Sequence, residues 1–401
     1  MRALLRHFFH QDHVIVALMG MCVVGLLVFV TFNVSFLNPV EQMVTNMKFT
    51  DIYNKVKNFN SEPDTSRFIT IVDMTDVYNR GELATLINDI ADLHPKVIGV
   101  DVVFEGERDD VLGNTMLEEA VVNHRDLLVF AAKLTDFDQK KKTFKVLNRS
   151  YFTDRIDGLK EGFVNLEDDM RNALIRDCRS GMRQDNQEAL MPSLPASILH
   201  HYGIDVPLRD QPMLIDFSPM IFPTLQWDSL SLHPEMIRNH IILLGAHEQE
   251  SDMHLTPLDK MSGVELHAYT LQTLMNHRNI TDAPLWLDLL ATFLACYLLA
   301  AFIELSERRS QRNHISALRV FLDESEWLKA GIVVVSIIIA TCIMHWVFEQ
   351  FDIYINALLV LAAMAVIVQC HDTYMALMNA LYVNHSNWWW VQHSLAQDDD
   401  E

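Results

Sequence analysis

Cysteine is scarce in this sequence. Five copies occur in 401 residues, and only Cys178 lies in the segment of ordinary soluble composition that separates the first two long apolar runs. That segment can form no internal disulfide, and CxxC pairs and other zinc-binding spacings are absent. The sequence therefore excludes a disulfide-stapled extracellular scaffold and a thiolate zinc site.

Catalytic motifs are also absent. The sequence contains no GxSxG elbow, no P-loop, no GxGxxG and no HExxH. The segment DMTD at 73–76 follows an expected strand, but aspartyl-phosphate chemistry of the dehalogenase kind uses DxD, and the second acid lies one residue too far. We therefore expect no enzymatic activity and no cofactor.

Basic residues are outnumbered in the soluble segment. Residues 38–283 hold 39 acidic and 24 basic side chains, a formal charge of −15 within a whole-chain charge of −22. An acidic surface repels phosphate backbones, so nucleic acid is excluded as a partner of this segment.

Long apolar runs are what the sequence has instead. They cover residues 14–32, 285–303, 331–348 and 353–370, and each is close to the ~20 residues that span a bilayer core. Arg2 and Arg6 precede the first run, and no A-x-A cleavage site follows it, which is typical of an uncleaved signal anchor. Arg308, Arg309 and Arg312 follow the second run, so basic residues gather on the side of the N-terminus.

These patterns predict four membrane spans with one large domain outside. Residues 371–401 contain no Lys or Arg, so their cytoplasmic placement depends on counting the spans. The expected order is a cytoplasmic N-terminus (1–12), a first span (13–37), an extracytoplasmic domain (38–283), a second span (284–305), a basic cytoplasmic loop (306–328), a third and a fourth span (329–348 and 353–372) and a short acidic cytoplasmic tail (373–401).

The soluble segment has the pattern of an α/β domain. Short runs rich in β-branched residues, near-continuous in apolar character, are typical of a mostly parallel sheet that flanking helices cover on both faces. The expected strands lie at 67–74, 96–104, 127–134, 213–217 and 240–246, and the expected helices at 81–95, 114–126 and 192–203. The alternation of strands and helices predicts right-handed crossovers between parallel strands.

Acidic side chains follow the expected strands. In open α/β sheets, ligands bind in the crevice beyond the carboxyl ends of the strands. Asp73, Asp76, Asp101 and Glu105 would meet there with the loop that follows Gly245. We predict a ligand site at this edge; the alternative is a structural network of hydrogen bonds around the same carboxylates.

The loop and helix after Gly245 admit more than one interpretation. His247, Asp252 and His254 could hold a metal, although their spacing matches no zinc helix and no calcium loop. Ser262 and Glu265 have the spacing of a capping box at a helix N-terminus. His267 falls on the apolar face of that helix, which predicts a buried histidine.

The same residues resemble a known family. A strand that ends in glycine, an Asp, a Thr-Pro pair and a helix that opens with Gly-Val-Glu-x-His-Ala are similar to the CHASE2 domain, an extracytoplasmic sensor of bacterial membrane receptors. The matching residues are Gly245, Asp252, Thr256, Pro257, Gly263, Val264, Glu265, His267 and Ala268. The resemblance covers residues 38–372 and implies signal reception at the bacterial inner membrane, with one span before the domain and three after it. Asp252, Thr256 and His267 join the candidate ligand-binding residues.

The resemblance also implies partners. Similar proteins usually carry a C-terminal kinase or cyclase, whereas this sequence continues for about 31 residues after its last span. We therefore expect a stand-alone sensor that binds an unknown small molecule or envelope signal, contacts membrane lipid, and signals through a separate protein. Receptors of this design often form homodimers. The alternatives are a ligand-independent scaffold subunit of an envelope complex and a metal-dependent hydrolase that uses His247, Asp252 and His254.

Overall fold

The chain divides into two compact units. The computed structural model describes residues 8–33, 51, 58–59, 62–168, 174–185, 187–278, 280–312, 326–385 and 388–394. One unit consists of Met1–Phe49 with Asp282–Glu401, and the other of Thr50–Thr281. The basic segment expected at 306–328 lies largely outside the described residues, as do the first seven and the last seven residues of the chain.

Four long helices make up most of the first unit, and each is long and apolar enough to cross a membrane. They are α2 (Gln11–Asn33), α9 (Leu285–Arg312), α11 (Glu326–Phe351) and α12 (Ala357–His385). A two-residue strand, β18 (Ile353–Tyr354), and a short helix, α13 (Trp389–Gln392), complete the unit. Helix α12 continues 13 residues beyond residue 372, into the part of the sequence that we had assigned to the tail.

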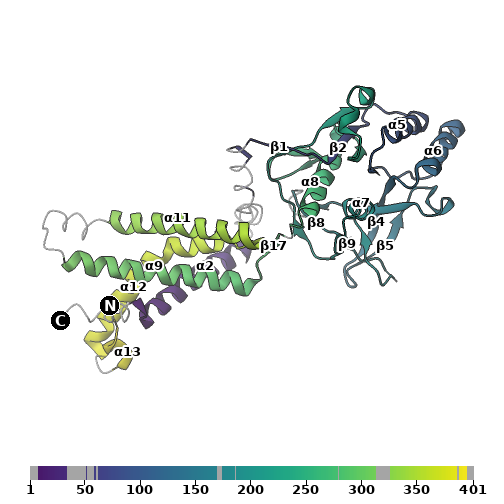
Figure 1. Ribbon diagram of the computed structural model, residues 1–401. Helices are drawn as coiled ribbons and strands as arrows, with labels where there is room; N and C mark the ends of the chain where they lie inside the picture. Colours follow the sequence, from purple (N-terminus) through teal and green to yellow (C-terminus); the bar gives the residue numbers. More distant parts are fainter. Residues whose placement is uncertain are drawn as a thin grey trace. The chain divides into compact units, whose positions relative to one another are not determined.

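Helices α2, α9 and α12 pack on one another around an apolar core (Figure 1). Its innermost side chains include Val16, Ala17, Ala300 and Ala363, which are fully buried. The three alanines among them allow the helix backbones to approach closely, as is common inside membranes. Most residues of α11 remain exposed, so its apolar surface is available to lipid.

A seven-stranded sheet forms the centre of the second unit. Strand β14 lies between β2 and β3 and pairs with both in parallel, although it follows them by a long stretch of chain. All strand pairs of this sheet are parallel except β4 with β5. The order is β13 (Thr224–Gln226), β2 (Ile69–Asp73), β14 (Ile241–Gly245), β3 (Val97–Val100), β4 (Leu128–Asp138) and β5 (Thr143–Asn148), and β6 (Lys160–Phe163) also pairs with β4.

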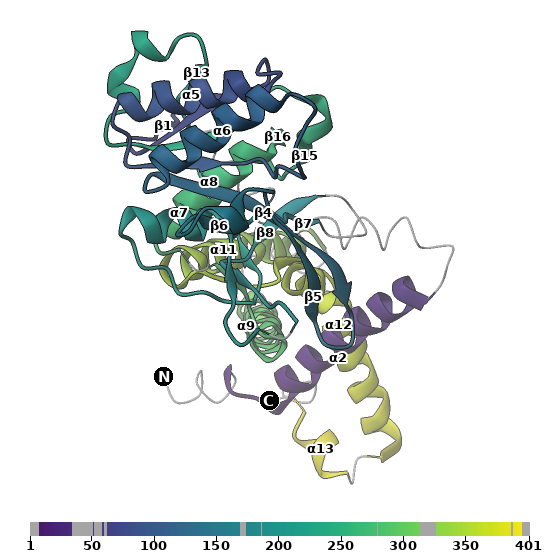
Figure 2. The ribbon, with the colours of Figure 1, turned by 90° about the vertical axis from the view of Figure 1, so that its right-hand side faces the viewer.

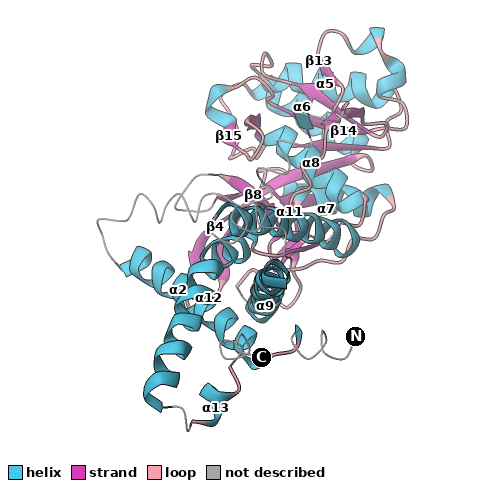
Figure 3. Ribbon diagram, turned by 90° about the vertical axis from the view of Figure 1, so that its left-hand side faces the viewer, coloured by secondary structure: helices cyan, strands magenta, loops and turns pink. Residues whose placement is uncertain are grey.

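Two helix layers cover the two faces of this sheet (Figures 2 and 3). Helices α5 (Arg80–Asp92) and α6 (Val111–His124) pack on one face, and α7 (Leu194–Tyr202) and α8 (Gly263–Met275) on the other. Successive strand residues point to opposite faces. Within β14, therefore, Ile241 and Leu243 join the core under α7 and α8, whereas Ile242 and Leu244 join the core under α5 and α6. The predicted α/β class with a mostly parallel sheet and four apolar helices is confirmed.

Short strands lie outside the main sheet. The segment expected as a strand at 213–217 contributes only β11 (Met213–Leu214), which pairs antiparallel with β8 (Ile175–Cys178) and not with the parallel strands. The other short strands are β1 (Asp64–Thr65) with β12 (Met220–Ile221), β7 (Glu167–Asp168) beside β8, β9 (Gly181–Met182) with β10 (Met191–Pro192), β15 (Met253–Leu255) with β16 (Lys260–Ser262), and β17 (Thr281–Asp282).

Candidate ligand site

The central position of β14 makes the chain diverge at the carboxyl edge of the sheet. The chain leaves β2 and β3 toward helices α5 and α6 on one face, and leaves β14 toward α8 on the opposite face. Neighbouring loops thus diverge beside the last residue of β14, which is where ligands bind in open α/β sheets. Asp73, Gly245 and Asp101 stand at the ends of these three strands, and the N–H of Asp101 donates to the carbonyl of Leu244.

Asp73 is buried and accepts hydrogen bonds from the loops around it. Its Oδ1 accepts hydrogen bonds from the N–H and hydroxyl of Thr75 and from the N–H of His247, at 2.9, 2.6 and 2.9 Å. Its Oδ2 accepts one from the Gln226 amide at 3.3 Å. Burial acts to raise the pKa of Asp73, but these hydrogen bonds outweigh it and lower the pKa below the ordinary range. All of these donors belong to the protein. The surroundings of Asp73 therefore match a structural network of hydrogen bonds, which is the alternative to a ligand site at this edge.

Asp101 faces His267 at the start of α8. The strand ends at Val100, so Asp101 lies just beyond it, and its Oδ1 is 3.8 Å from Nε2 of the buried His267. Burial raises the pKa of the Asp101 carboxyl, the charge of His267 acts to lower it, and Asp252 raises it further. A second pair lies nearby, in which Nε2 of His254 is 3.6 Å from Oδ1 of Asp252.

Two glycines allow these loops to approach α8. A Cβ atom on Gly245 would lie 2.9 Å from Cβ of Val264 and 3.3 Å from Cβ of Asp101. A Cβ atom on Gly263 would lie 2.9 Å from the Asp252 carboxylate. Packing therefore requires glycine at position 245, whereas at position 263 the exposed Asp252 side chain would have to move. The structure thus brings Asp101, Gly245, Asp252 and His267 together around the start of α8.

Thr256 and Ser262 have local structural roles. The Thr256 hydroxyl donates to the carbonyl of Asp259 and accepts from the N–H groups of Leu258 and Asp259, which fixes the turn between β15 and β16. Ser262 Oγ accepts from the N–H of Glu265 at 3.3 Å, so it caps α8 as expected. The return bond of the expected capping box, from the Ser262 N–H to the Glu265 carboxylate, is not found among the described residues. Burial raises the pKa of Glu265.

A pocket of about 320 Å³ opens beyond β2 and β3, beside this cluster. It lies between the N-terminus of α5 and the segment after β3. Of the residues that we predicted, Glu105 lines it, and Asp76 accepts a hydrogen bond from the hydroxyl of Tyr78, which also lines it. The other lining residues used below are Asn79, Arg80, Phe104, Gly106 and Arg108.

Arg80 is the residue of this pocket that sequence reasoning missed. It is only 6% exposed, its guanidinium lies 4.8 Å from the ring centre of Tyr151, and it donates to the side-chain oxygen of Asn114 and to the carbonyl of Gly106. Its Nε has no hydrogen-bond partner, and none of the described carboxylates forms an ion pair with it. A buried cation that lacks an anionic partner costs several kcal/mol.

Arg80 and its neighbours left little signal in the sequence. Arg80 follows Asn79, whose side chain caps α5, so an arginine in the first helical turn reads as an ordinary surface residue. Asn114 and Tyr151 come from distant segments, and only the tertiary fold brings them to the guanidinium. A capping motif that begins with Asn and continues to Glu82 was the one local clue, because it places Arg80 at the start of α5.

A group of side chains with the geometry of metal ligands lies in the first unit. In the described part of the chain, one group of His, Cys, Asp and Glu side chains has three ligand atoms within 4.8 Å of one another, and it consists of Glu304, Glu307 and His371 in the first unit. His247, Asp252 and His254 do not form such a group. The geometry therefore gives the metal-dependent hydrolase no support from these three residues.

Comparison with known proteins gives one family. The sequence model of the CHASE2 domain matches residues 23–303, more than two thirds of the chain, beginning within α2 and ending within α9. Neither the curated proteins nor the solved structures gave a match.

Proposed function

Because the chain belongs to the CHASE2 domain family, a family of extracytoplasmic sensor domains, we propose that it is a multi-pass receptor of the bacterial inner membrane. In this proposal the α/β unit binds a small molecule outside the cytoplasm, and the membrane helices pass the change to a separate protein. In this proposal the chain performs no catalytic step, and ligand binding at the α/β unit needs no cofactor.

The observation that carries this proposal is the buried guanidinium of Arg80 at the edge of a pocket. Its present partners are neutral oxygens, from Asn114 and Gly106. Arginine binds carboxylates with two parallel hydrogen bonds, and such pairs are stronger than bonds to neutral acceptors. We therefore assign the pocket to a small organic anion that carries a carboxylate.

A ligand at Arg80 has a direct way to change the protein. The Gly106 carbonyl holds the segment after β3 against Arg80, and the Arg108 N–H contacts Asn114. An anion that replaces the Gly106 carbonyl as the acceptor of the Arg80 guanidinium would release Gly106. The segment 102–108 would then adopt different positions in the bound and free states. A ligand shifts an equilibrium only through such a difference in affinity between two states.

Transmission would run through the membrane helices. Helices α2, α9 and α12 share one core, so small sliding or rotation of one helix displaces the others. The basic segment between α9 and α11 is the proposed contact for the separate partner, and a homodimer in the lipid bilayer is the proposed state of the receptor. The acidic domain is not assigned a nucleic-acid partner, because its charge repels phosphates.

The test is thermal unfolding of the full-length protein in detergent with a panel of small mono- and dicarboxylates and their neutral amides. A carboxylate at 100 times its Kd should stabilise the protein by about 2.7 kcal/mol. Arg80→Met should abolish that stabilisation. Arg108→Gln is the matched control, because Arg108 lines the same pocket from an exposed position, and it should retain the effect.

Two results would contradict the proposal. Stabilisation by the neutral amides to the same extent as by the acids would mean that the pocket does not select anions. Equal stabilisation of the Arg80→Met variant and the wild-type protein would place the ligand elsewhere. Arg80→Lys, which keeps the positive charge, separates loss of binding from loss of folding and should retain weakened binding.

A further inference from the structure

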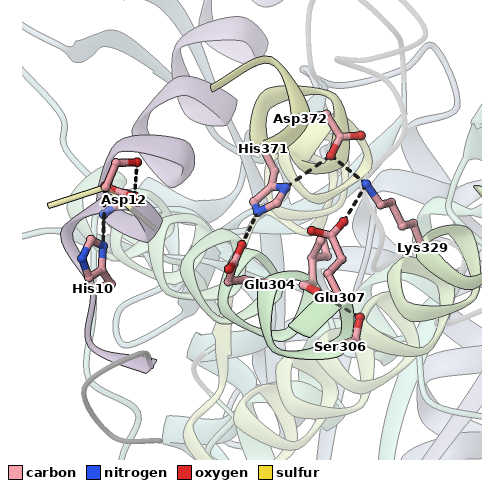
Figure 4. A network of polar contacts seen from close by, with 10 residues as sticks. His10, Asp12, Glu304, Ser306, Glu307, Lys329, His371 and Asp372 are labelled. Atoms are coloured by element: carbon pink, nitrogen blue, oxygen red, sulfur yellow. Dashed lines mark hydrogen bonds and ion pairs between the residues drawn. The ribbon is translucent and has the colours of Figure 1, made fainter. Parts of the chain in front are cut away.

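A polar network joins three membrane helices at one end of the first unit (Figure 4). Glu304 and Glu307 come from α9, Lys329 from α11, and His371 and Asp372 from α12. Lys329 Nζ lies 2.7 Å from Glu307 Oε1 and 2.8 Å from Asp372 Oδ1. These residues lie at the ends of the expected spans, and His371 and Glu304 are nevertheless buried.

The imidazole of His371 sits between two carboxylates. Its Nε2 is 3.2 Å from Glu304 Oε2, and its Nδ1 is 3.3 Å from Asp372 Oδ1. His371 is 1% exposed and Glu304 is 8% exposed, so their contact is closed to water, whereas the Asp372 side chain is 46% exposed. A neutral imidazole carries one N–H, and both ring nitrogens here face oxygens. One of the two contacts therefore needs a cation or a second proton between its atoms.

The arrangement fits a metal ion on the Nε2 side. Glu304, Glu307 and His371 each offer a ligand atom, and these atoms lie within 4.8 Å of one another. Two ligands at roughly 2.1 Å from one tetrahedral ion lie roughly 3.4 Å apart, close to the observed separation of His371 Nε2 and Glu304 Oε2. Metal-bound histidines usually donate their other N–H to a carboxylate, which is the relation of His371 to Asp372.

We propose that Glu304, Glu307 and His371 bind a divalent first-row transition metal ion such as Zn²⁺. Two carboxylates with one imidazole form a donor set suited to Zn²⁺, and the imidazole disfavours Mg²⁺, which requires oxygen ligands. Asp372 orients His371 from the other side of the ring.

Lys329 shares a carboxylate with this site. Its ammonium bridges Glu307 and Asp372, so a cation is already accommodated here. On metal binding, Glu307 turns toward the ion and Lys329 stays with Asp372. The ammonium therefore competes with the metal for Glu307.

An ion in this position would link α9 to α12. These two helices already pack on one another, and the ion would fix their separation at the end where α9 continues into the basic segment. The site lies in the first unit and involves no residue of the pocket at Arg80. Its success or failure is therefore independent of the proposed sensor ligand.

The test measures Zn²⁺ content of the full-length protein in detergent after removal of metal with a chelator and re-equilibration against Zn²⁺. Wild-type protein should retain one Zn²⁺ per chain in the presence of excess Mg²⁺. His371→Asn and Glu304→Gln should lose it, and Asp372→Asn should bind it about 10–100-fold more weakly. His385→Asn, an exposed histidine of the same helix, is the matched control and should retain the ion.

Lys329→Met gives a second, independent readout, because it leaves all three ligands in place. Removal of the competing ammonium should tighten Zn²⁺ binding relative to wild type. Absence of Zn²⁺ from the wild-type protein would overturn the proposal and leave a protonated His371 as the bridging group. Retention of Zn²⁺ by a folded His371→Asn variant, or an unchanged affinity in Lys329→Met, would overturn it as well.

Discussion

At the scale of single residues, the carboxylates beyond the strands divide into two kinds. Asp73 is surrounded by protein donors and holds the loop after β14 to the loop after β2 through the N–H of His247. Glu105 is exposed and lines the pocket, and Asp76 is exposed and accepts a hydrogen bond from Tyr78, another lining residue. Sequence could place these acids at one edge, since that follows from the end of each strand. It could not tell which of them meets the N–H of His247, because that depends on a loop more than 100 residues away.

The role of Asp73 gives a prediction with a defined pH dependence. Its pKa is lowered in the folded protein, so its contribution to stability is fully present above the ordinary aspartate pKa of about 3.9 and is lost as the pH falls through the folded value. Asp73→Asn should lower the free energy of unfolding by about 1–3 kcal/mol at pH 7, because charge-assisted hydrogen bonds are weakened. The difference from wild type should shrink below a pH of about 4.

Thermal unfolding in detergent from pH 7 to pH 3 measures both effects. Asp76→Asn serves as the control, because an exposed carboxylate should change stability by less than about 0.5 kcal/mol. A constant difference between Asp73→Asn and wild type across this pH range would contradict the assigned role of the charge.

Gly245 gives a second prediction at this scale. Gly245→Ala places a methyl group 2.9 Å from Val264 Cβ, so it should destabilise the protein by about 1–3 kcal/mol through overpacking. Gly25→Ala is the contrasting control, because a Cβ atom there meets no other atom within 4 Å and alanine favours the helix. Equal melting temperatures of Gly245→Ala and wild type would show that α8 can move away from β14 without cost.

At the scale of elements, the start of α5 positions the pocket. The Asn79 side chain accepts a hydrogen bond from the Glu82 N–H at 2.8 Å. In return, the Glu82 carboxylate accepts hydrogen bonds from the N–H groups of Asn79 and Tyr78. This complete capping box fixes the turn that carries Arg80. A capping box was expected at Ser262, where only the bond from the Glu265 N–H forms, and not at Asn79, because the helix expected there began one residue later.

Substitution of this cap tests its importance. Asn79→Ala should cost about 1 kcal/mol of stability, whereas Asn79→Ser, which keeps a capping oxygen, should cost much less. Because Arg80 is the next residue, Asn79→Ala should also weaken carboxylate binding at the pocket. Thermal unfolding with and without the carboxylate reports both changes, and equal behaviour of the two variants would show that the cap does not position Arg80.

Strands differ in how well the sequence predicts them. Ile69–Asp73, Val97–Val100 and Ile241–Gly245 are near-continuous apolar segments, and burial on both faces of a parallel sheet explains that composition. The segment at 213–217 has the same composition because its side chains are also buried, but it lies beside β8 in another sheet. Apolar composition reports burial, and it does not report which strand is the neighbour.

At the scale of the whole molecule, the four long apolar runs were the clearest indication of structure in the sequence. Twenty consecutive apolar residues have few alternatives to a membrane helix, and all four expected spans are long helices. The end of the last span was less readable, because α12 remains helical to His385 through a segment of mixed composition. Hydropathy marks where a helix can lie in lipid and gives no information on where the helix ends in water.

The expected orientation of these spans leads to a direct test. Protease added to intact spheroplasts should digest the domain between residues 50 and 281, and a tag fused after Glu401 should remain intact until the membrane is opened. Immunoblots for the domain and for the tag measure the two outcomes. Loss of the tag together with survival of the domain would reverse the orientation and remove the basis for a receptor.

The late position of β14 in the chain has a consequence for biogenesis. Its five residues separate β2 from β3, which are synthesised more than 140 residues earlier. Until Ile241 has been synthesised, β2 and β3 therefore each lack the strand that pairs with one of their two edges. A fragment that stops before Ile241 would leave these two edges open, so it should not form the seven-stranded sheet and should tend to aggregate.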